Sequence, residues 1–390
     1  MSPKILFLKS GSFSNINNKV HQFLKSEFSG HIIETIDAWE ILKKRTFIFC
    51  YLLNIYFFIT EYGYDIVIGN KKRKEWLQWF FATSFISLQI SREVKKICRG
   101  KEFKFTFQTQ SIFNGKLEKT PHFIYTDHTT QTNRLYPDVN AKQYMRSKRF
   151  INKSEVKAYD NASLIFTFGS LTASSLINQY KIPEKKIITV YAGCNTNIEN
   201  KFNPEKYFLK NILFVGTEWE RKGGPLLLKA FEMVLKQHPD ANLIIVGCTP
   251  DVSHLPNCTV VGKVRVEDMA SYYEKATLFC LPTIREPFGI VFIEAMSFKL
   301  PIIANKIGSI PDIVINGKNG YLIQNDSMEY SKIICNLLSD PQKCKEMGEN
   351  GFKFAKSEFN WEIVGKKIKN SINNFLISDG ELDKTKKYFD

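Results

Sequence analysis

The chain has 390 residues, 44% of them hydrophobic, and a formal net charge of +15. This length exceeds one compact core and predicts about two domains. Eight scattered cysteines, without CxxC spacing or histidines at metal-ligand spacing, exclude a disulfide or zinc framework and indicate reduced thiols in a cytosolic protein. No helix-turn-helix spacing, RNP-like sequence or zinc finger accompanies the positive charge, so nucleic acid is not an expected partner.

Short apolar runs alternate with longer amphipathic runs along the whole chain, which predicts parallel α/β sheets. The first run, at 4–10, indicates a buried strand rather than a signal peptide. It leads into a loop with Gly11 and Ser12, residues that strand-to-helix loops commonly use. The other predicted strands are 65–70, 103–109, 122–128, 163–169, 186–193, 211–216, 241–247, 258–263, 276–283, 300–305 and 320–324.

Much of the positive charge lies between residues 43 and 104, with one cluster at 71–74 and another at 92–104. Two aromatic-rich apolar runs, 46–60 and 76–90, are interleaved with it. Each run is too short or too polar to cross a bilayer, which needs about twenty apolar residues. Two interpretations stay open: helices that lie on an anionic membrane surface, or core helices of the first domain with a solvated basic face.

His128 ends the strand predicted at 122–128, beside Asp127 and a threonine-rich turn. A lone histidine at a strand end is often only a satisfied core residue, but this combination favours a functional role. Farther along, residues 195–208 are polar and lack an apolar period, which predicts an interdomain linker. The expected domains are 1–198 and 205–359.

A strand, a turn and a helix are predicted over 214–228, FVGTEWERKGGPLLL. Gly216 ends the strand, and Arg221 and Lys222 directly precede Gly223, where the helix begins. Two cations at a helix N-terminus suit the neutralisation of a departing diphosphate.

Glu286 and Glu294 stand eight residues apart in REPFGIVFIEAM. A turn is expected through Gly289, with a helix entered near Ile290 and Glu294 more than one turn inside it. The amides of Phe288, Gly289 and Ile290 would then bind phosphate oxygens. Glu286, expected on an exposed loop, would accept hydrogen bonds from a sugar, and Glu294 from a ribose.

The string EPFGIVFIEAM, with LPIIANKIGSIPDIVINGKNGYLI after it, resembles the E-x7-E signature of retaining nucleotide-sugar glycosyltransferases of family 4, the glycosyl transferases group 1. The resemblance implies the GT-B fold: two doubly wound Rossmann-like domains that face a central cleft. It also implies that a helix at about 360–378, around Trp361, crosses back to the first domain before a polar tail at 379–390.

The same resemblance assigns roles to individual residues. It implies that Gly11 and Ser12 face the donor diphosphate and that His128 faces the donor sugar. Backbone groups would read the nucleobase in the loop formed by Gly262, Lys263 and Val264. Thr217 occupies the place of a family arginine, so Lys222 is the main cation and Arg221 its substitute.

The expected activity is therefore retaining transfer of a sugar from a nucleoside diphosphate to a hydroxyl acceptor: a glycan, a lipid-linked glycan or a protein. No cofactor is expected, and no metal, because cationic side chains and a helix N-terminus neutralise the phosphates. The expected location is cytoplasmic, with peripheral contact to the inner membrane face under the membrane interpretation. The alternatives are a nucleotide-sugar epimerase of the same fold and a non-catalytic membrane-associated relative.

Overall fold

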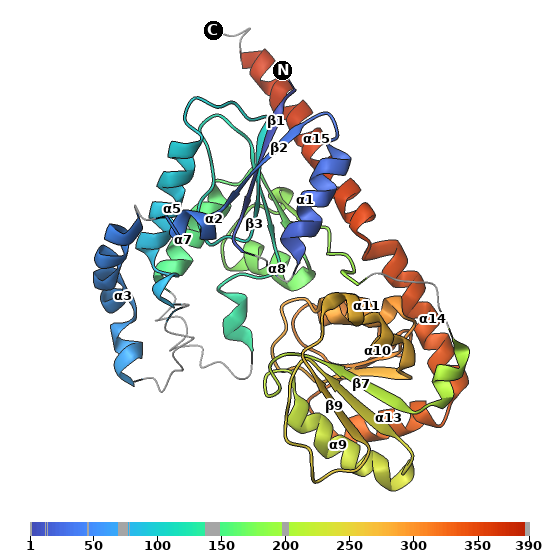
Figure 1. The fold of residues 1–390 in the computed structure, drawn as a ribbon. Coiled ribbons are helices and arrows are strands. Elements are labelled where there is room, and N and C mark those ends of the chain that lie inside the picture. The colour runs from blue at the N-terminus through green and yellow to red at the C-terminus, as the bar shows by residue number, and fades with distance from the viewer. Residues whose placement is uncertain are drawn as a thin grey trace. The chain divides into compact units, whose positions relative to one another are not determined.

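The structure is a computed structural model that describes residues 2–386, except 12, 14, 45–46, 69–76, 78, 137–148 and 197–202. The chain forms two compact units, one made of residues 1–135, 139–190 and 365–390, the other of 136–138 and 191–364. Each unit has its own six-stranded sheet with helices on both faces (Figure 1). We refer to them as unit 1 and unit 2.

The sheet of unit 1 has the order β2-β1-β3-β4-β5-β6, and all neighbouring strands are parallel. The central strands are buried along their length, as expected when helices cover both faces of a parallel sheet. Its strands are β1 (Lys4–Lys9), β2 (Ile32–Asp37), β3 (Phe105–Thr109), β4 (His122–Thr126), β5 (Leu164–Thr167) and β6 (Ile187–Thr189).

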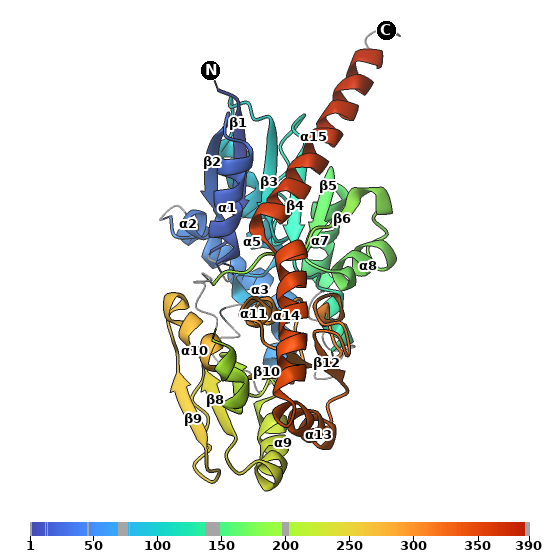
Figure 2. The ribbon, with the colours of Figure 1, turned by 90° about the vertical axis from the view of Figure 1, so that its right-hand side faces the viewer.

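Alternate residues of β1 face two helical layers. Leu6 and Leu8 pack with α2 and α5 in one apolar cluster. On the other face, α1 packs Phe23 against Phe107, and α15 packs Phe375 against Phe123; Figure 2 shows α1 and α15 on this same side. The helices of unit 1 are α1 (Ile16–Glu27), α2 (Ala38–Leu42), α3 (Ile48–Ile68), α5 (Ser84–Ile97), α7 (Arg149–Asp160), α8 (Ser170–Asn178) and, from residue 365 onward, α15 (Trp361–Lys386), with short 3-10 helices η2 (Thr132–Leu135) and η3 (Glu184–Lys186).

The strand predicted at 65–70 is wrong, because residues 65–68 continue helix α3 and residues 69–70 lie outside the described part. The aromatic side chains of α3 pack against the segment around α5: Phe57 stacks on Phe85 at 4.7 Å between ring centroids. The strand that the prediction missed is β2, which lies at the sheet edge beside β1. Its sequence, IIETID, has Glu34 and Asp37 among the apolar residues, so the apolar run that would predict a strand is weak.

Unit 2 has the strand order β12-β11-β10-β7-β8-β9, again all parallel. All six strands were predicted, and they are β7 (Asn211–Val215), β8 (Asn242–Val246), β9 (Cys258–Gly262), β10 (Leu278–Leu281), β11 (Ile302–Asn305) and β12 (Gly320–Ile323). Its helices are α9 (Gly224–Gln237), α10 (Ala270–Lys275), α11 (Ile290–Ser297), α12 (Ile310–Ile313), α13 (Ser327–Leu338) and α14 (Pro341–Glu358), with 3-10 helices η4 (Pro204–Phe208) and η5 (Val266–Asp268).

The described part of the predicted linker and helix α15 make specific contacts. Within 195–208, Tyr207 of η4 is buried and its hydroxyl donates to the carbonyl of Lys299 at 2.8 Å. Helix α15 continues to Lys386 rather than ending near 378. Its Lys369 reaches Glu27 of α1 at 3.3 Å.

Candidate functional site

Lys222 is positioned by two glycines at the carboxyl end of the unit 2 sheet. Gly223 adopts a left-handed φ of 77° before α9, and a Cβ there would lie 1.9 Å from the carbonyl oxygen of Pro282. A Cβ on Gly216, just after β7, would lie 2.8 Å from Cγ of Lys222. Only glycine permits these approaches, so the turn and its lysine stay against the neighbouring strand end.

The Nζ of Lys222 donates a hydrogen bond to Oε2 of Glu286, and both residues are buried. The expectation that Glu286 lies on an exposed loop is therefore wrong. The loop at Gly308 packs over it so closely that a Cβ on Gly308 would lie 1.9 Å from the Glu286 carbonyl oxygen. The pair joins residues 64 apart in sequence, a contact that no local pattern reveals.

Arg221 lies in the same turn but has different partners. Its Nε and Nη2 donate to the carboxylate of Glu218 at 3.0 Å, and its Nη1 donates to the carbonyl of Arg285 at 2.7 Å. These hydrogen bonds hold the pKa of Glu218 below its usual value. Arg221 thus ties the turn before α9 to the loop that carries Glu286.

Helix α11 begins at Ile290, as predicted, after Gly289 in a left-handed conformation with φ 98°. The first turn of such a helix presents backbone N–H groups that suit phosphate oxygens. Phe288, directly before it, is buried. The structure therefore brings the predicted amide site and Glu286 into one loop.

Glu294 lies inside α11 and is buried, and its carboxylate accepts a hydrogen bond from the Tyr273 hydroxyl at 3.0 Å. Burial raises its pKa, while that hydrogen bond opposes the rise. The sequence did not reveal Tyr273 as a partner, because it comes from α10, 21 residues away. Binding of a ribose by Glu294 stays a prediction.

The predicted base-reading loop follows β9 on the same sheet edge. Gly262 is the last residue of β9, and its carbonyl accepts from the Gly247 amide at 2.7 Å. The amide of Gly216 in turn donates to the carbonyl of Val246 at 2.9 Å. Lys263 is exposed and Val264 half-buried beyond this edge. Ligands of α/β sheets bind at such carboxyl ends.

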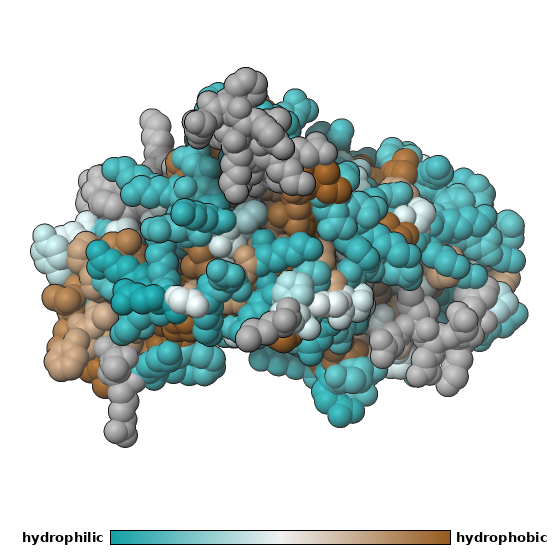
Figure 3. All heavy atoms as spheres, turned by 90° about the horizontal axis from the view of Figure 1, so that it is seen from above, coloured by the Kyte–Doolittle hydropathy of each residue, from teal (hydrophilic) through white to brown (hydrophobic). Residues whose placement is uncertain are grey.

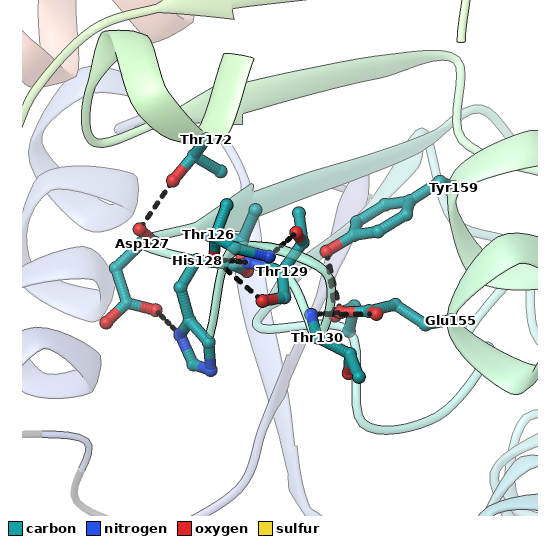
Figure 4. A network of polar contacts seen from close by, with 10 residues as sticks. Thr126, Asp127, His128, Thr129, Thr130, Glu155, Tyr159 and Thr172 are labelled. Atoms are coloured by element: carbon teal, nitrogen blue, oxygen red, sulfur yellow. Dashed lines mark hydrogen bonds and ion pairs between the residues drawn. The ribbon is translucent and has the colours of Figure 1, made fainter. Parts of the chain in front are cut away.

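In unit 1, His128 follows β4 as predicted, and its Nδ1 lies 2.7 Å from Oδ1 of Asp127 (Figure 4). Burial lowers the pKa of His128, but the charge and hydrogen bond of Asp127 outweigh it and raise that pKa to about 9. The backbone is held by Thr126, whose hydroxyl donates to the His128 carbonyl at 2.9 Å, and by Thr172, which donates to the Asp127 carbonyl at 2.6 Å. An imidazolium is therefore the form expected at neutral pH.

Sequence reasoning missed Glu155, a buried carboxylate on α7 that fixes the loop after His128. Its oxygens accept from the Thr130 amide at 3.0 and 3.2 Å, from Ser111 at 2.9 Å and from Tyr159 at 3.1 Å (Figure 4). The hydroxyl of Tyr180 donates a further hydrogen bond to Oε2 of Glu155. A single glutamate on an amphipathic helix is typical of a solvated face, so the sequence offers no signal for this role.

The Gly11 loop is fixed by Asp37, another residue that the sequence did not reveal. Asp37 ends the missed strand β2, and its Oδ1 accepts from the amides of Gly11 at 3.1 Å and Trp39 at 3.0 Å. Gly11 has a left-handed φ of 63°, and a Cβ on it would lie 2.9 Å from the Trp39 ring. Ser12 lies outside the described residues.

Within the described part of the chain, no cluster of three or more His, Cys, Asp or Glu side chains could hold a metal ion. No helix there is long and apolar enough to span a bilayer. The basic cluster at 71–74 is outside the described ranges.

The fold is that of GT-B glycosyltransferases. Sucrose-phosphate synthase from Thermosynechococcus elongatus superposes with a TM-score of 0.67 and 16% identity, over 96% of this chain and 100% of that structure. Anabaena HepE in complex with UDP superposes with a TM-score of 0.63 and 17% identity, over 95% and 100% of the two chains. The predicted pair of Rossmann-like domains is confirmed.

Residues 197–354, which lie mostly in unit 2, match the family Glycosyl transferases group 1, so the group 1 part of the predicted resemblance is confirmed. Spore coat protein SA of Bacillus subtilis is 26% identical over 242 residues, which cover 54% of this chain and 64% of that protein. The chain spans about half to two-thirds of the length of the curated relatives it matches.

Proposed function

We propose that this protein is a retaining, metal-independent glycosyltransferase that moves a sugar from a nucleoside diphosphate to a hydroxyl acceptor. The observation that carries the proposal is the buried Lys222–Glu286 pair beside the N-terminus of α11. The loops at the strand ends bring together a cation, a carboxylate and helix amides. The cation and the amides suit the two phosphates of a sugar diphosphate, and the carboxylate suits its sugar. The match to group 1 glycosyltransferases covers these residues.

In this proposal, Lys222 shifts from Glu286 to the donor diphosphate when the donor binds. Glu286 is then released to accept hydrogen bonds from the sugar hydroxyls. The amides of Phe288, Gly289 and Ile290 bind the phosphate oxygens, with Arg221 as a second cation. Charge that develops on the leaving diphosphate is met by fixed positive groups, which is the largest source of rate enhancement in many enzymes.

The nucleoside end of the donor has its own candidates. Glu294 accepts from the ribose, and Gly262, Lys263 and Val264 bind the base. UDP is the first nucleotide to test, because Anabaena HepE, which has the same fold, was solved with UDP. The resemblance further implies front-face attack, in which the leaving phosphate oxygen takes the acceptor proton, so no protein nucleophile is required.

An anionic membrane surface is a second proposed partner. Besides the basic clusters in the sequence, the apolar exposed side of α3 supports it. Phe49 is 76% exposed, Tyr56 67% and Leu52 63%. Residues 46–60 contain no charged side chain, while Lys43, Lys44 and the 92–104 cluster supply positive charge nearby in sequence. A helix of this kind, beside basic residues, suits the surface of an anionic leaflet.

The decisive experiment titrates UDP-, GDP- and ADP-sugars by calorimetry and then assays transfer with excess EDTA. We expect one nucleotide to bind, transfer to persist in EDTA and NMR to show a retained anomeric configuration. A strict need for magnesium or manganese would contradict metal independence, and an inverted product would contradict retention. Interconversion of the donor sugar without transfer would favour the epimerase, and binding without turnover the non-catalytic relative.

A further inference from the structure

Unit 1 contains a pocket of about 730 Å³ at the carboxyl ends of β1, β3 and β4. This volume lies within the range of roughly 300–1,000 Å³ that is typical of small-molecule sites. Its polar part is formed by strand-end residues, among them Ser10, Thr126 and His128. All of its lining residues belong to unit 1.

The rest of the lining is apolar and comes mainly from α2, α5 and the segment before α5. Trp39 and Phe81 meet edge to face, with ring centroids 5.3 Å apart. Leu42 and Ile90 also line the pocket and are buried, and Ile112, which follows Ser111, lines it while 43% exposed. The pocket therefore combines hydrogen-bonding residues, here called its polar end, with an apolar lining, here called its apolar end.

The lining is held in place by hydrogen bonds to two carboxylates, Glu155, which itself lines the pocket, and Asp37, which does not. Glu155 fixes the Thr130 amide and Ser111, which line the polar end. Asp37 fixes the amide of Trp39, at the apolar end. Such fixed walls indicate a preformed site rather than a gap between mobile side chains.

The apolar wall is continuous with helix α3. Tyr51 of α3 packs on Phe81 at 5.8 Å between centroids, and its hydroxyl donates to the Leu42 carbonyl. The outer side of the same helix forms an apolar surface, seen as brown spheres at the left end of Figure 3, where Figure 1 places α3. Its exposed members are Ile48, Phe49, Leu52, Leu53, Ile55, Tyr56 and Ile59.

We propose that this pocket binds the acceptor, and that the acceptor is a lipid. Its hydroxyl head lies at the polar end beside His128, and its apolar chain lies against Trp39, Phe81 and Ile112. The apolar outer side of α3 gives such a lipid a route from a bilayer to the same wall. This inference rests on the proposed transfer to a hydroxyl group and adds the class of acceptor.

The test uses the full chain and two probes with one head group, octyl glucoside below its micelle concentration and methyl glucoside. We expect calorimetry to show binding of octyl glucoside and much weaker binding of methyl glucoside. Ile112→Lys should weaken octyl glucoside binding by about tenfold or more, because an ammonium group is placed where the chain must lie. Ile112→Ser should weaken it less.

Leu88→Lys is the matched control, since Leu88 of α5 is 48% exposed and does not line the pocket. It should leave octyl glucoside affinity unchanged. Equal affinity for the two glucosides, or full affinity in both Ile112 variants, would overturn the inference. Loss of binding in Leu52→Glu but not in Ile112→Lys would also overturn it, because the chain would then lie on the outer side of α3.

The affinities for UDP, GDP and ADP, measured on the same samples, separate this inference from the proposed function. If one of these nucleotides binds and octyl glucoside does not, the acceptor class is wrong and the donor site stands. If octyl glucoside binds with the expected ranking and no nucleotide binds, the pocket stands and the proposed transfer fails.

Discussion

The two units have the same sheet architecture but offer opposite chemistry at their strand ends. In unit 2, the loops bring together a buried ammonium group, a buried carboxylate and a helix N-terminus. In unit 1, strand-end residues supply the polar lining of a pocket whose apolar lining comes mainly from α2, α5 and the segment before α5. The sheet fixes where the strand ends meet, and the residues of the surrounding loops and helices decide whether that place suits an anion or an apolar group.

The buried carboxylates of the two units make the same point. Glu286 is neutralised by a lysine, whereas Glu155 is satisfied by an amide and by hydroxyl donors. A lysine ammonium group can move from its carboxylate to an incoming anion. Neutral donors from the backbone and from neighbouring side chains instead keep the loop in one conformation. Glu286 is therefore suited to act on a ligand and Glu155 to position one.

The largest effect is expected from Lys222→Met, which leaves the Glu286 carboxylate buried without a counter-charge. Breaking a buried pair costs about 3–5 kcal/mol, so the free energy of unfolding in urea should fall by this order. Transfer should fall by a factor on the order of a hundred or more, since a transition-state contact is lost. Lys229→Met, at an exposed position on α9, is the control. Wild-type diphosphate affinity in the Lys222 variant would contradict the role of this lysine.

Replacing both partners separates stability from catalysis. Removal of Glu286 alone should also destabilise the fold, contrary to what an exposed loop residue would do, and should reduce transfer about a hundredfold. The double variant Lys222→Met with Glu286→Met should regain much of the unfolding free energy, because no unpaired charge stays buried. It should remain inactive. A double variant as unstable as the sum of the singles would show that the two residues do not act as a pair.

A smaller effect is expected from pH at His128 in unit 1. The pKa of His128 is raised from 6.5 to about 9 in the folded protein. Its contribution to the free energy of unfolding is therefore complete below pH 6.5 and is lost as the pH rises through about 9. Because the side chain is partly exposed, we expect a loss of only about 1 kcal/mol. Asp127→Asn should remove the effect, and transfer should fall over the same range if the imidazolium acts on substrate. If the difference in unfolding free energy between wild type and His128→Gln stays constant from pH 6 to 10, the raised pKa of His128 is contradicted.

The smallest effect on folding is expected at α3, where Leu52→Glu and Leu53→Glu alter exposed side chains and should change the unfolding free energy by no more than about 0.5 kcal/mol. Sedimentation with anionic liposomes should nevertheless be lost. Neutral liposomes and a Leu88→Glu variant are the controls. If the wild type does not sediment with anionic liposomes at low salt, the basic residues form only a solvated face.

The sequence by itself determined the features that depend on neighbouring residues. Apolar runs located all six strands of unit 2, and Gly223 and Gly289 marked the starts of α9 and α11. In unit 1 the same reasoning placed His128 at a strand end but misread residues 65–70 and missed β2. Such reasoning depends on a local apolar pattern. The edge strand β2 lacks it because it contains carboxylates, and the end of α3 is misleading because that helix packs its aromatic side chains on another helix.

Only the tertiary structure decided which side chains meet. Lys222 and Glu286 come from loops 64 residues apart, and the Glu155 oxygens reach Thr130 across 25 residues. Burial, ion pairing and pocket lining depend on how strands are ordered in a sheet, and that order follows from the packing of distant segments. A residue type can show what chemistry is possible at a position. Its partners show whether that chemistry serves to bind a ligand or to hold the fold.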